Sequence, residues 1–163
     1  MKYFVIYDGN CNLCTTLVQL LEQLDKGERF KYIPMQKLAT DLATDFVTDL
    51  TDRLSVGNQD LLEGENDVGE YLKSLGITAK GCELGMILID AQNPERRWQG
   101  SDAAEEIANL LPTGDVFIKA YRSLPGMKWM GDRFYEQIRD NRYALFGKRS
   151  DTYQSAYPPK INN

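Results

Sequence analysis

Apolar residues follow a strand pattern, then a helix pattern and then a strand pattern again over the first 34 residues. Residues 2–7 form a run rich in aromatic and β-branched side chains, which is typical of a buried central strand. Residues 29–33 alternate like a second strand, which Pro34 closes. Between them, leucines at three- and four-residue spacing predict an amphipathic helix that ends at Lys26-Gly27: Leu13, Leu17, Leu20, Leu21 and Leu24. This order predicts a β-α-β unit.

The middle of the chain has a weaker pattern. Apolar residues at a strict four-residue interval predict one or two helices: Leu38, Leu42, Phe46, Leu50 and Leu54. Residues 55–65 are polar and contain glycine, so we expect a loop there. Residues 67–75 predict a short helix that stops at Gly76.

The second half begins with the clearest strand of that half, residues 85–90. A turn at Asn93-Pro94 followed by residues 96–99 predicts a β-hairpin. Asp102 and Glu105 have the spacing of a capping box, which predicts a helix that runs to about Leu111. Two further helices are predicted at residues 115–123 and 131–143, and a frayed or loosely packed tail from Lys148 onward.

The turn between the first strand and the first helix contains two cysteines three positions apart, Cys11 and Cys14. The first is placed at the start of the helix, where unpaired N–H groups and the helix dipole favour the thiolate. The second lies one turn further in, within reach for a disulfide. In the same turn we expect Asn10 to cap the helix and Gly9 to supply backbone freedom.

Composition narrows the chemistry of this site. The chain has 163 residues, a net charge of −5 and no histidine. Histidine-dependent triads, zinc sites and proton shuttles are therefore excluded. The acidic balance argues against nucleic-acid or anionic-membrane partners. A late basic group is read as a solvated helix face: Arg139, Arg142, Lys148 and Arg149.

Neither a membrane span nor the layout of a signal peptide is recognisable in the sequence, so a cytoplasmic location is expected. Thiols are kept reduced there, which favours a catalytic or metal-binding C-x-x-C over a structural disulfide.

The opening Tyr7-Asp8-Gly9-x-Cys11-x-x-Cys14 resembles the DCC family of thiol-disulfide oxidoreductases, whose starting pattern is Y-D-G-x-C-x-x-C. Two later segments are also similar to that family: residues 100–103, and the ending Tyr135…Asn141-Arg142-Tyr143…Phe146-Gly147. Element order and resemblance together indicate an α/β, thioredoxin-like sheet (β-α-β, then β-β-α) with a helical insert and extra C-terminal helices. We expect one domain over residues 1–147 and a loosely packed or disordered tail over residues 148–163.

The expected activity is thiol–disulfide exchange. Cys11, expected nearer the surface, attacks as the thiolate, and Cys14 resolves the mixed disulfide. The expected partners are a disulfide-containing protein or a small-molecule thiol, together with an unidentified electron donor, and no cofactor beyond the dithiol is implied. Asp8 either accepts the proton of Cys14 or only shapes the turn.

The cysteine pair and Cys82 each have a second interpretation. A non-catalytic binding module would use the cysteine pair to hold a metal or to stabilise the turn, although a zinc site would need Cys82 and a carboxylate to complete it. Cys82 is either a third redox thiol or a small buried filler. Thioredoxin-like proteins usually have a cis-proline before the third strand, whereas this chain has Cys82-Glu83-Leu84-Gly85 there.

Overall fold

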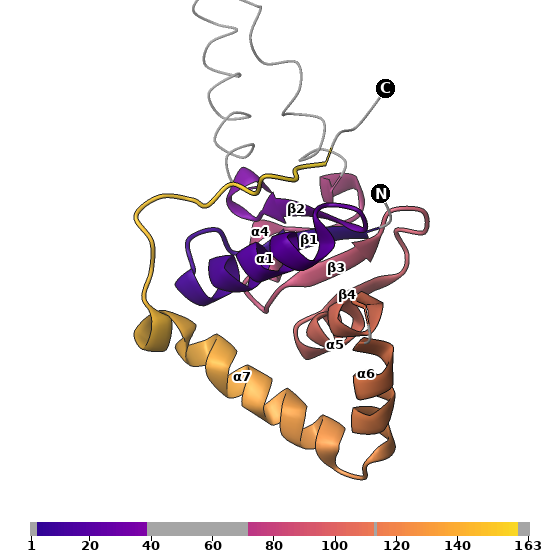
Figure 1. Cartoon of the computed structure of the whole chain (residues 1–163). Coiled ribbons are helices and arrows are strands. Elements are labelled where there is room, and N and C mark those ends of the chain that lie inside the picture. Colours follow the sequence, from indigo (N-terminus) through magenta and orange to yellow (C-terminus); the bar gives the residue numbers. More distant parts are fainter. Residues whose placement is uncertain (1–2, 39–71, 113, 160–163) are drawn as a thin grey trace, which may run out of the picture.

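A four-stranded mixed sheet with the order β2-β1-β3-β4 forms the centre of the protein (Figure 1). The computed structural model describes residues 3–38, 72–112 and 114–159. Strand β1 (Tyr3–Tyr7) pairs in parallel with β2 (Phe30–Pro34), and helix α1 (Asn12–Asp25) connects them. Strand β3 (Ile87–Asp90) runs antiparallel to both β1 and β4 (Arg97–Gln99). The predicted β-α-β unit, central first strand and hairpin are confirmed.

Alternation along the strands separates two apolar cores, one on each face of the sheet. Phe4 and Ile6 of β1 belong to one core, which also contains Leu38, Leu72 and Cys82. The opposite core is formed by the alternate strand residues and by helices α1 and α5 (Ser101–Leu110): Val5, Tyr7, Val18, Leu21, Phe30, Tyr32, Leu88, Ala103 and Ile107. Helices α1 and α5 therefore cover the same face of the sheet.

The leucine stripe of α1 does not coincide with the face that packs on the sheet. The buried positions of this helix are Thr15, Val18, Leu21 and Asp25. Three of its leucines, Leu17, Leu20 and Leu24, are instead 44%, 50% and 54% exposed. Helix α1 thus has a second apolar face that the sheet does not cover.

Asp25 explains how the chain leaves α1 and enters β2. Its buried carboxylate accepts hydrogen bonds from the backbone N–H groups of Arg29 and Phe30, each at 2.9 Å at the closest. Lys26 adopts a left-handed conformation (φ 50°) at the end of the helix, as the predicted stop at Lys26-Gly27 requires. Paired backbone donors of this kind fix the start of the strand.

After β4 the chain is helical. The predicted capping box of Asp102 and Glu105 is wrong, because Gly100 is the N-cap residue and no side chain caps α5. Both carboxylates instead accept hydrogen bonds from Lys128 Nζ, at 2.7 and 3.1 Å. Helix α6 (Gly114–Ser123) matches its prediction. Helix α7 (Met127–Phe146) is longer than predicted and runs from the end of α6 back toward α1 (Figure 1).

The described part of the tail, residues 148–159, packs on the domain instead of lying loosely against it. Tyr153 Oη donates a hydrogen bond to Glu22 at 2.8 Å, and the Tyr153 carbonyl accepts one from Tyr7 Oη at 2.8 Å. The backbone N–H of Tyr32 bonds to the Tyr157 carbonyl at 3.2 Å. Tail side chains therefore extend the core that lies under α1.

Most of the predicted helical insert lies outside the described residues, including the apolar positions from Leu42 to Leu54 and the loop at 55–65. Residues 72–74 are helical and Gly76 has φ 72°, in line with the predicted helix end. The short helix α4 (Ala79–Cys82) follows and precedes β3. Within the described part of the chain, no helix is long and apolar enough to cross a membrane.

Candidate active site

Cys11 is the residue that caps the N-terminus of α1. Its backbone is extended (φ −94°, ψ 120°), and its Sγ accepts a hydrogen bond from the Cys14 backbone N–H at 3.3 Å. The predicted cap, Asn10, is therefore wrong by one position. A sulfur at this place receives an otherwise unpaired N–H and lies at the positive end of the helix dipole.

The pKa values of the two thiols are shifted in opposite directions. A hydrogen bond from the Cys14 side chain, the largest influence, lowers the pKa of Cys11 to about 7, against the opposing effect of burial. The same hydrogen bond, together with burial, raises the pKa of Cys14. As pH rises through about 7, Cys11 therefore becomes the ionised sulfur of the pair, while Cys14 stays protonated beside it.

The solvent accessibility of the two cysteines differs from the expectation that Cys11 is nearer the surface. Cys11 is fully buried, whereas Cys14 is partly exposed. The segment after α7 covers Cys11: Asn12 N–H bonds to the Gly147 carbonyl at 3.4 Å, and Arg149 N–H bonds to the Asn10 carbonyl at 2.7 Å. Residues 147–149, far from the cysteine turn in the sequence, therefore pair with the backbone on both sides of Cys11, which was expected nearer the surface.

Asp8 connects the cysteine turn to the rest of the domain. It is buried, and its Oδ1 accepts hydrogen bonds from the Asn10 backbone N–H at 3.0 Å and from Gln36 Nε2 at 2.7 Å. The contact with Asn10 is the predicted turn-forming interaction. Gln36 also accepts a hydrogen bond from the Gly9 N–H at 3.0 Å, so one amide side chain fixes both residues.

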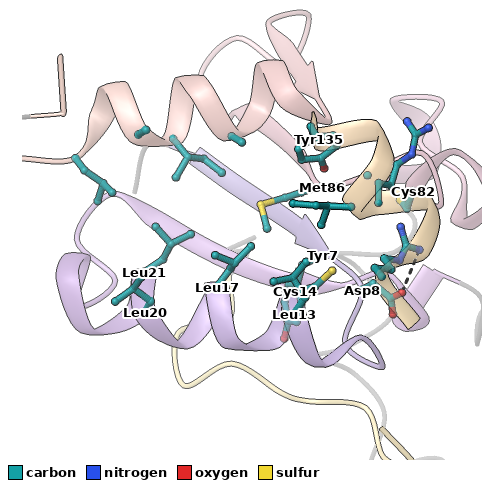
Figure 2. Close-up of a pocket in the computed structure, with 18 residues that line it drawn as sticks. Tyr7, Asp8, Leu13, Cys14, Leu17, Leu20, Leu21, Cys82, Met86 and Tyr135 are labelled. Carbon is teal, nitrogen blue, oxygen red and sulfur yellow. Dashed lines mark hydrogen bonds and ion pairs between the residues drawn. The ribbon is translucent and has the colours of Figure 1, made fainter. Parts of the chain in front are cut away.

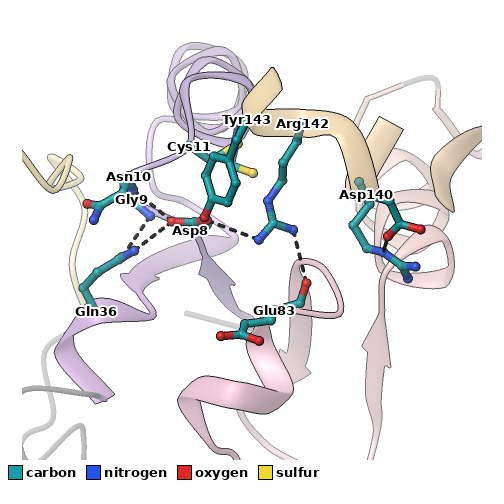
Figure 3. A network of polar contacts seen from close by, with 11 residues as sticks. Asp8, Gly9, Asn10, Cys11, Gln36, Glu83, Asp140, Arg142 and Tyr143 are labelled. Atoms are coloured by element: carbon teal, nitrogen blue, oxygen red, sulfur yellow. Dashed lines mark hydrogen bonds and ion pairs between the residues drawn. The ribbon is translucent and has the colours of Figure 1, made fainter. Parts of the chain in front are cut away.

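The other oxygen of Asp8 faces helix α7. Arg142 Nη2 contacts Asp8 Oδ2 at 3.3 Å, and the Tyr143 hydroxyl donates to the same oxygen (Figure 3). Arg142 Nη1 also donates to the Glu83 carbonyl at 3.2 Å. Arg142 is only 8% exposed, so its predicted place on a solvated basic face is wrong. A buried carboxylate directly after β1 explains why this guanidinium is turned inward.

Two residues next to Asp8 have steric roles. Tyr7 is buried and packs in the core, as predicted. Gly9 does not adopt a left-handed conformation, so backbone freedom is not its role. A Cβ at Gly9 would lie 2.6 Å from Thr152 Cγ2, which shows that glycine is needed here for the close approach of the tail.

Cys82 lies in the core at the end of α4, and burial raises the pKa of its thiol to about 11. It therefore stays protonated at neutral pH. The loop that follows it, residues 83–86, takes the position where the fold usually has a cis-proline. None of the described peptide bonds is cis. Gly85 (φ 127°) lies so close to α7 that a Cβ there would be 2.6 Å from Tyr135 Oη.

A groove of about 230 Å³ opens beside Cys14 (Figure 2). Helices α1, α5 and α7 form its walls, and Tyr7 and Met86 lie on the sheet side. Leu17 and Leu20, on the uncovered face of α1, point into it. Asp8, Cys82 and Arg142 also line it, whereas Cys11 does not.

The structure thus brings the predicted residues Asp8, Cys11 and Cys14 to one place. Sequence reasoning missed Gln36 and the roles of Arg142 and Tyr143. The last two had a signal, since they belong to the ending that resembles the family, but nothing local to residues 141–143 indicated a carboxylate partner in the first strand-to-helix turn.

A thioredoxin-like α/β domain with a dithiol where its first helix begins is the class that this fold and site define. The family model described as DCC1-like thiol-disulfide oxidoreductase matches residues 5–64 and 58–148. The chain belongs to that family. Membership and the close cysteine pair support a redox role and, at a coarse level, disulfide or thiol substrates. No curated protein and no solved structure matches the chain significantly.

The thiol pair predicts a titration of the reduced protein. Thiolate absorbance near 240 nm should rise as pH rises through about 7, because Cys11 loses its proton there. Cys14→Ala removes the side-chain donor, so the midpoint should move up toward the ordinary value of 9.0. Cys14→Ser keeps a hydroxyl donor and should lie closer to the unsubstituted protein. A midpoint near 9 in the unsubstituted protein would contradict this geometry.

The buried ion pair predicts a stability difference between two arginines of α7. Arg142→Met leaves the Asp8 carboxylate buried without its cation and should lower the free energy of unfolding by about 3–5 kcal/mol. Arg133→Met is the matched control, because Arg133 pairs with Glu136 at an exposed position, where the loss should be below about 1 kcal/mol. Urea denaturation followed by circular dichroism measures both. Equal losses would mean that the Asp8–Arg142 pair does not stabilise the fold.

Proposed function

We propose that this protein is a thiol-disulfide oxidoreductase in which Cys11 is the attacking thiolate and Cys14 the resolving thiol. One observation carries the proposal: Cys11 Sγ occupies the N-cap position of α1 and accepts hydrogen bonds from both the backbone and the side chain of Cys14. These donors stabilise the thiolate and place the second sulfur beside it.

The reaction proceeds by two displacements. The Cys11 thiolate attacks one sulfur of a substrate disulfide, a mixed disulfide forms, and the other substrate sulfur leaves as a thiolate. Cys14 then loses its proton and attacks Cys11 Sγ, which closes the Cys11–Cys14 disulfide and releases the second substrate thiolate. The substrate gains two electrons, and the released thiolates take up two protons. An external thiol or dithiol reduces the protein again.

The exposure of the two sulfurs favours a second order of attack. Cys14 is partly exposed and lines the groove, whereas Cys11 is buried. In this order Cys14 attacks first, after Cys11 has accepted its proton, and Cys11 resolves. Both orders give the same products, and they differ in which sulfur carries the substrate in the mixed disulfide.

Single-cysteine variants separate the two orders. Under the first order, Cys14→Ser traps the substrate on Cys11, and Cys11→Ser has no reductase activity and traps nothing. Under the second order the two variants exchange roles. Intact-protein and peptide mass spectrometry after reaction with a small disulfide identifies the modified sulfur. A protein that turns over disulfides without either cysteine would refute both orders, and stoichiometric zinc in the purified protein would favour the binding-module alternative.

Asp8 is proposed to act mainly as a positioning residue. Its carboxylate already receives four hydrogen-bond donors: Asn10 N–H, Gln36 Nε2, Arg142 Nη2 and Tyr143 Oη. Its negative charge raises the pKa of Cys11, and the neighbouring Arg142 lowers it. The expected alternative, in which Asp8 accepts the proton of Cys14, places the same residue in the second displacement.

Asp8→Asn distinguishes these roles. A positioning role predicts a Cys11 pKa lower than in the unsubstituted protein, because the opposing charge is gone, and a less stable fold. It also predicts an unchanged rate of disulfide closure once Cys11 carries substrate. A proton-accepting role predicts a closure rate about 100-fold or more slower at neutral pH, which recovers as pH rises. Rapid mixing with a chromogenic disulfide measures release of the second thiol.

A further inference from the structure

The groove beside Cys14 is an apolar passage with its reactive group at one end. Leucines of α1, Ile107 of α5 and Ile138 of α7 line its length. In Figure 2 the leucines and Met86 point into the same space, and Cys14 and Asp8 lie together toward one end of it. A substrate held along these walls would bring a sulfur to Cys14, the cysteine that lines the groove and whose backbone N–H bonds to Cys11 Sγ.

The charged residues of the groove already have partners. Arg142 pairs with Asp8 at 3.3 Å, and Arg139 pairs with Asp140 at 2.8 Å. A substrate carboxylate or ammonium group would have to compete with these contacts while losing its own hydration. The groove therefore favours an uncharged, apolar body.

The backbone groups of the loop before β3, which would hold an extended polypeptide, are already paired. The backbone carbonyls of residues 83, 84 and 86 lie in the loop that replaces the cis-proline segment. They accept hydrogen bonds from two arginines of α7 and from the N–H of Gly100. These bonds are Arg142 Nη1 to Glu83 O at 3.2 Å, Arg139 Nη1 to Leu84 O at 3.4 Å, and Gly100 N–H to Met86 O at 2.9 Å. Recognition of a peptide by strand addition needs such groups to be unpaired.

The size of the groove fits a small molecule. Its volume of about 230 Å³ lies below the roughly 300–1,000 Å³ that is typical of pockets for drug-sized ligands. From these observations we infer that the substrate is a small, uncharged disulfide with an apolar body, which lies between α1, α5 and α7 while its sulfurs meet the dithiol. This inference rests on the proposed function and specifies its substrate class.

The reaction with this substrate follows the two displacements of the proposed mechanism. For a symmetric disulfide RS–SR, attack breaks the substrate S–S bond, forms a protein–SR mixed disulfide and releases RS⁻. Attack by the second cysteine forms the Cys11–Cys14 disulfide and releases the second RS⁻. The two thiolates become 2 RSH, and dithiothreitol in the assay supplies the two electrons of the next cycle.

Two disulfides of matched size test the inference with the unsubstituted protein. Di-n-propyl disulfide and bis(2-hydroxyethyl) disulfide differ only by a methyl group in place of a hydroxyl at each end. After normalisation to the rate of each with free dithiothreitol, kcat/KM should be at least about tenfold higher for the propyl compound, because an apolar pocket disfavours a hydroxyl in the place of a methyl group by up to about 100-fold. A disulfide-bonded peptide should be slower than the propyl compound.

Two leucines on the same helix provide matched variants. Leu20 (50% exposed) lines the groove, whereas Leu24 (54% exposed) does not, so neither substitution removes a core side chain. Leu20→Gln should raise KM for di-n-propyl disulfide about tenfold and raise KM for bis(2-hydroxyethyl) disulfide by a smaller factor. Leu24→Gln should change neither.

The outcomes separate this inference from the proposed function. If neither small disulfide nor the peptide is reduced, the proposed function fails. If the two small disulfides react equally, or if the peptide reacts faster than the propyl compound, the proposed function stands and the inference is overturned. Equal effects of Leu20→Gln and Leu24→Gln on the propyl compound would also overturn it.

Discussion

The arrangement of the site depends on the buried pair of Asp8 and Arg142. Asp8 directly follows the central strand, and Arg142 lies near the C-terminal end of α7. Their contact at 3.3 Å, with the Tyr143 hydroxyl on the same oxygen, fixes the last long helix against the first turn of the fold. Because α7 is the third wall of the groove and its arginines hold the loop at 83–84, this pair sets the shape of the substrate space as well as the turn.

The same geometry accounts for a buried sulfur whose pKa is lowered to about 7. Burial alone would keep Cys11 protonated, and the charge of Asp8 acts in the same direction. Fixed donors outweigh both effects, since the side chain and the backbone of Cys14 replace the water that a thiolate would bind. Arg142 contributes in the same direction while it neutralises Asp8, so the ion pair keeps the carboxylate close to the thiols at a reduced electrostatic cost.

Patterns of neighbouring residues were sufficient to predict the strands, the helices and the place of the dithiol. They were insufficient to predict the contacts that α7 and the tail make with the dithiol turn and the core. Strand alternation, helical periodicity and the stop at Lys26-Gly27 depend on neighbouring residues, so the β-α-β unit and the place of Cys11 were predictable. The inward position of Arg142 depends on a carboxylate 134 residues earlier. The packing of Tyr153 on Tyr7 is of the same kind, and no pattern within the tail indicates it. The capping box failed because Asp102 and Glu105 bind Lys128 of another helix.

Helix α1 has a leucine stripe that does not coincide with its buried face. An amphipathic helix that packs against one surface has one apolar stripe, whereas α1 has two apolar surfaces that share Leu21. Val18 and Leu21 pack on the sheet, and Leu17 and Leu20 face the groove while remaining about half exposed. Apolar surface left in water is unfavourable unless another molecule covers it. Leu17 and Leu20 are therefore better explained by the groove than by the core, and the cysteine that begins the helix places the sulfur pair beside that surface.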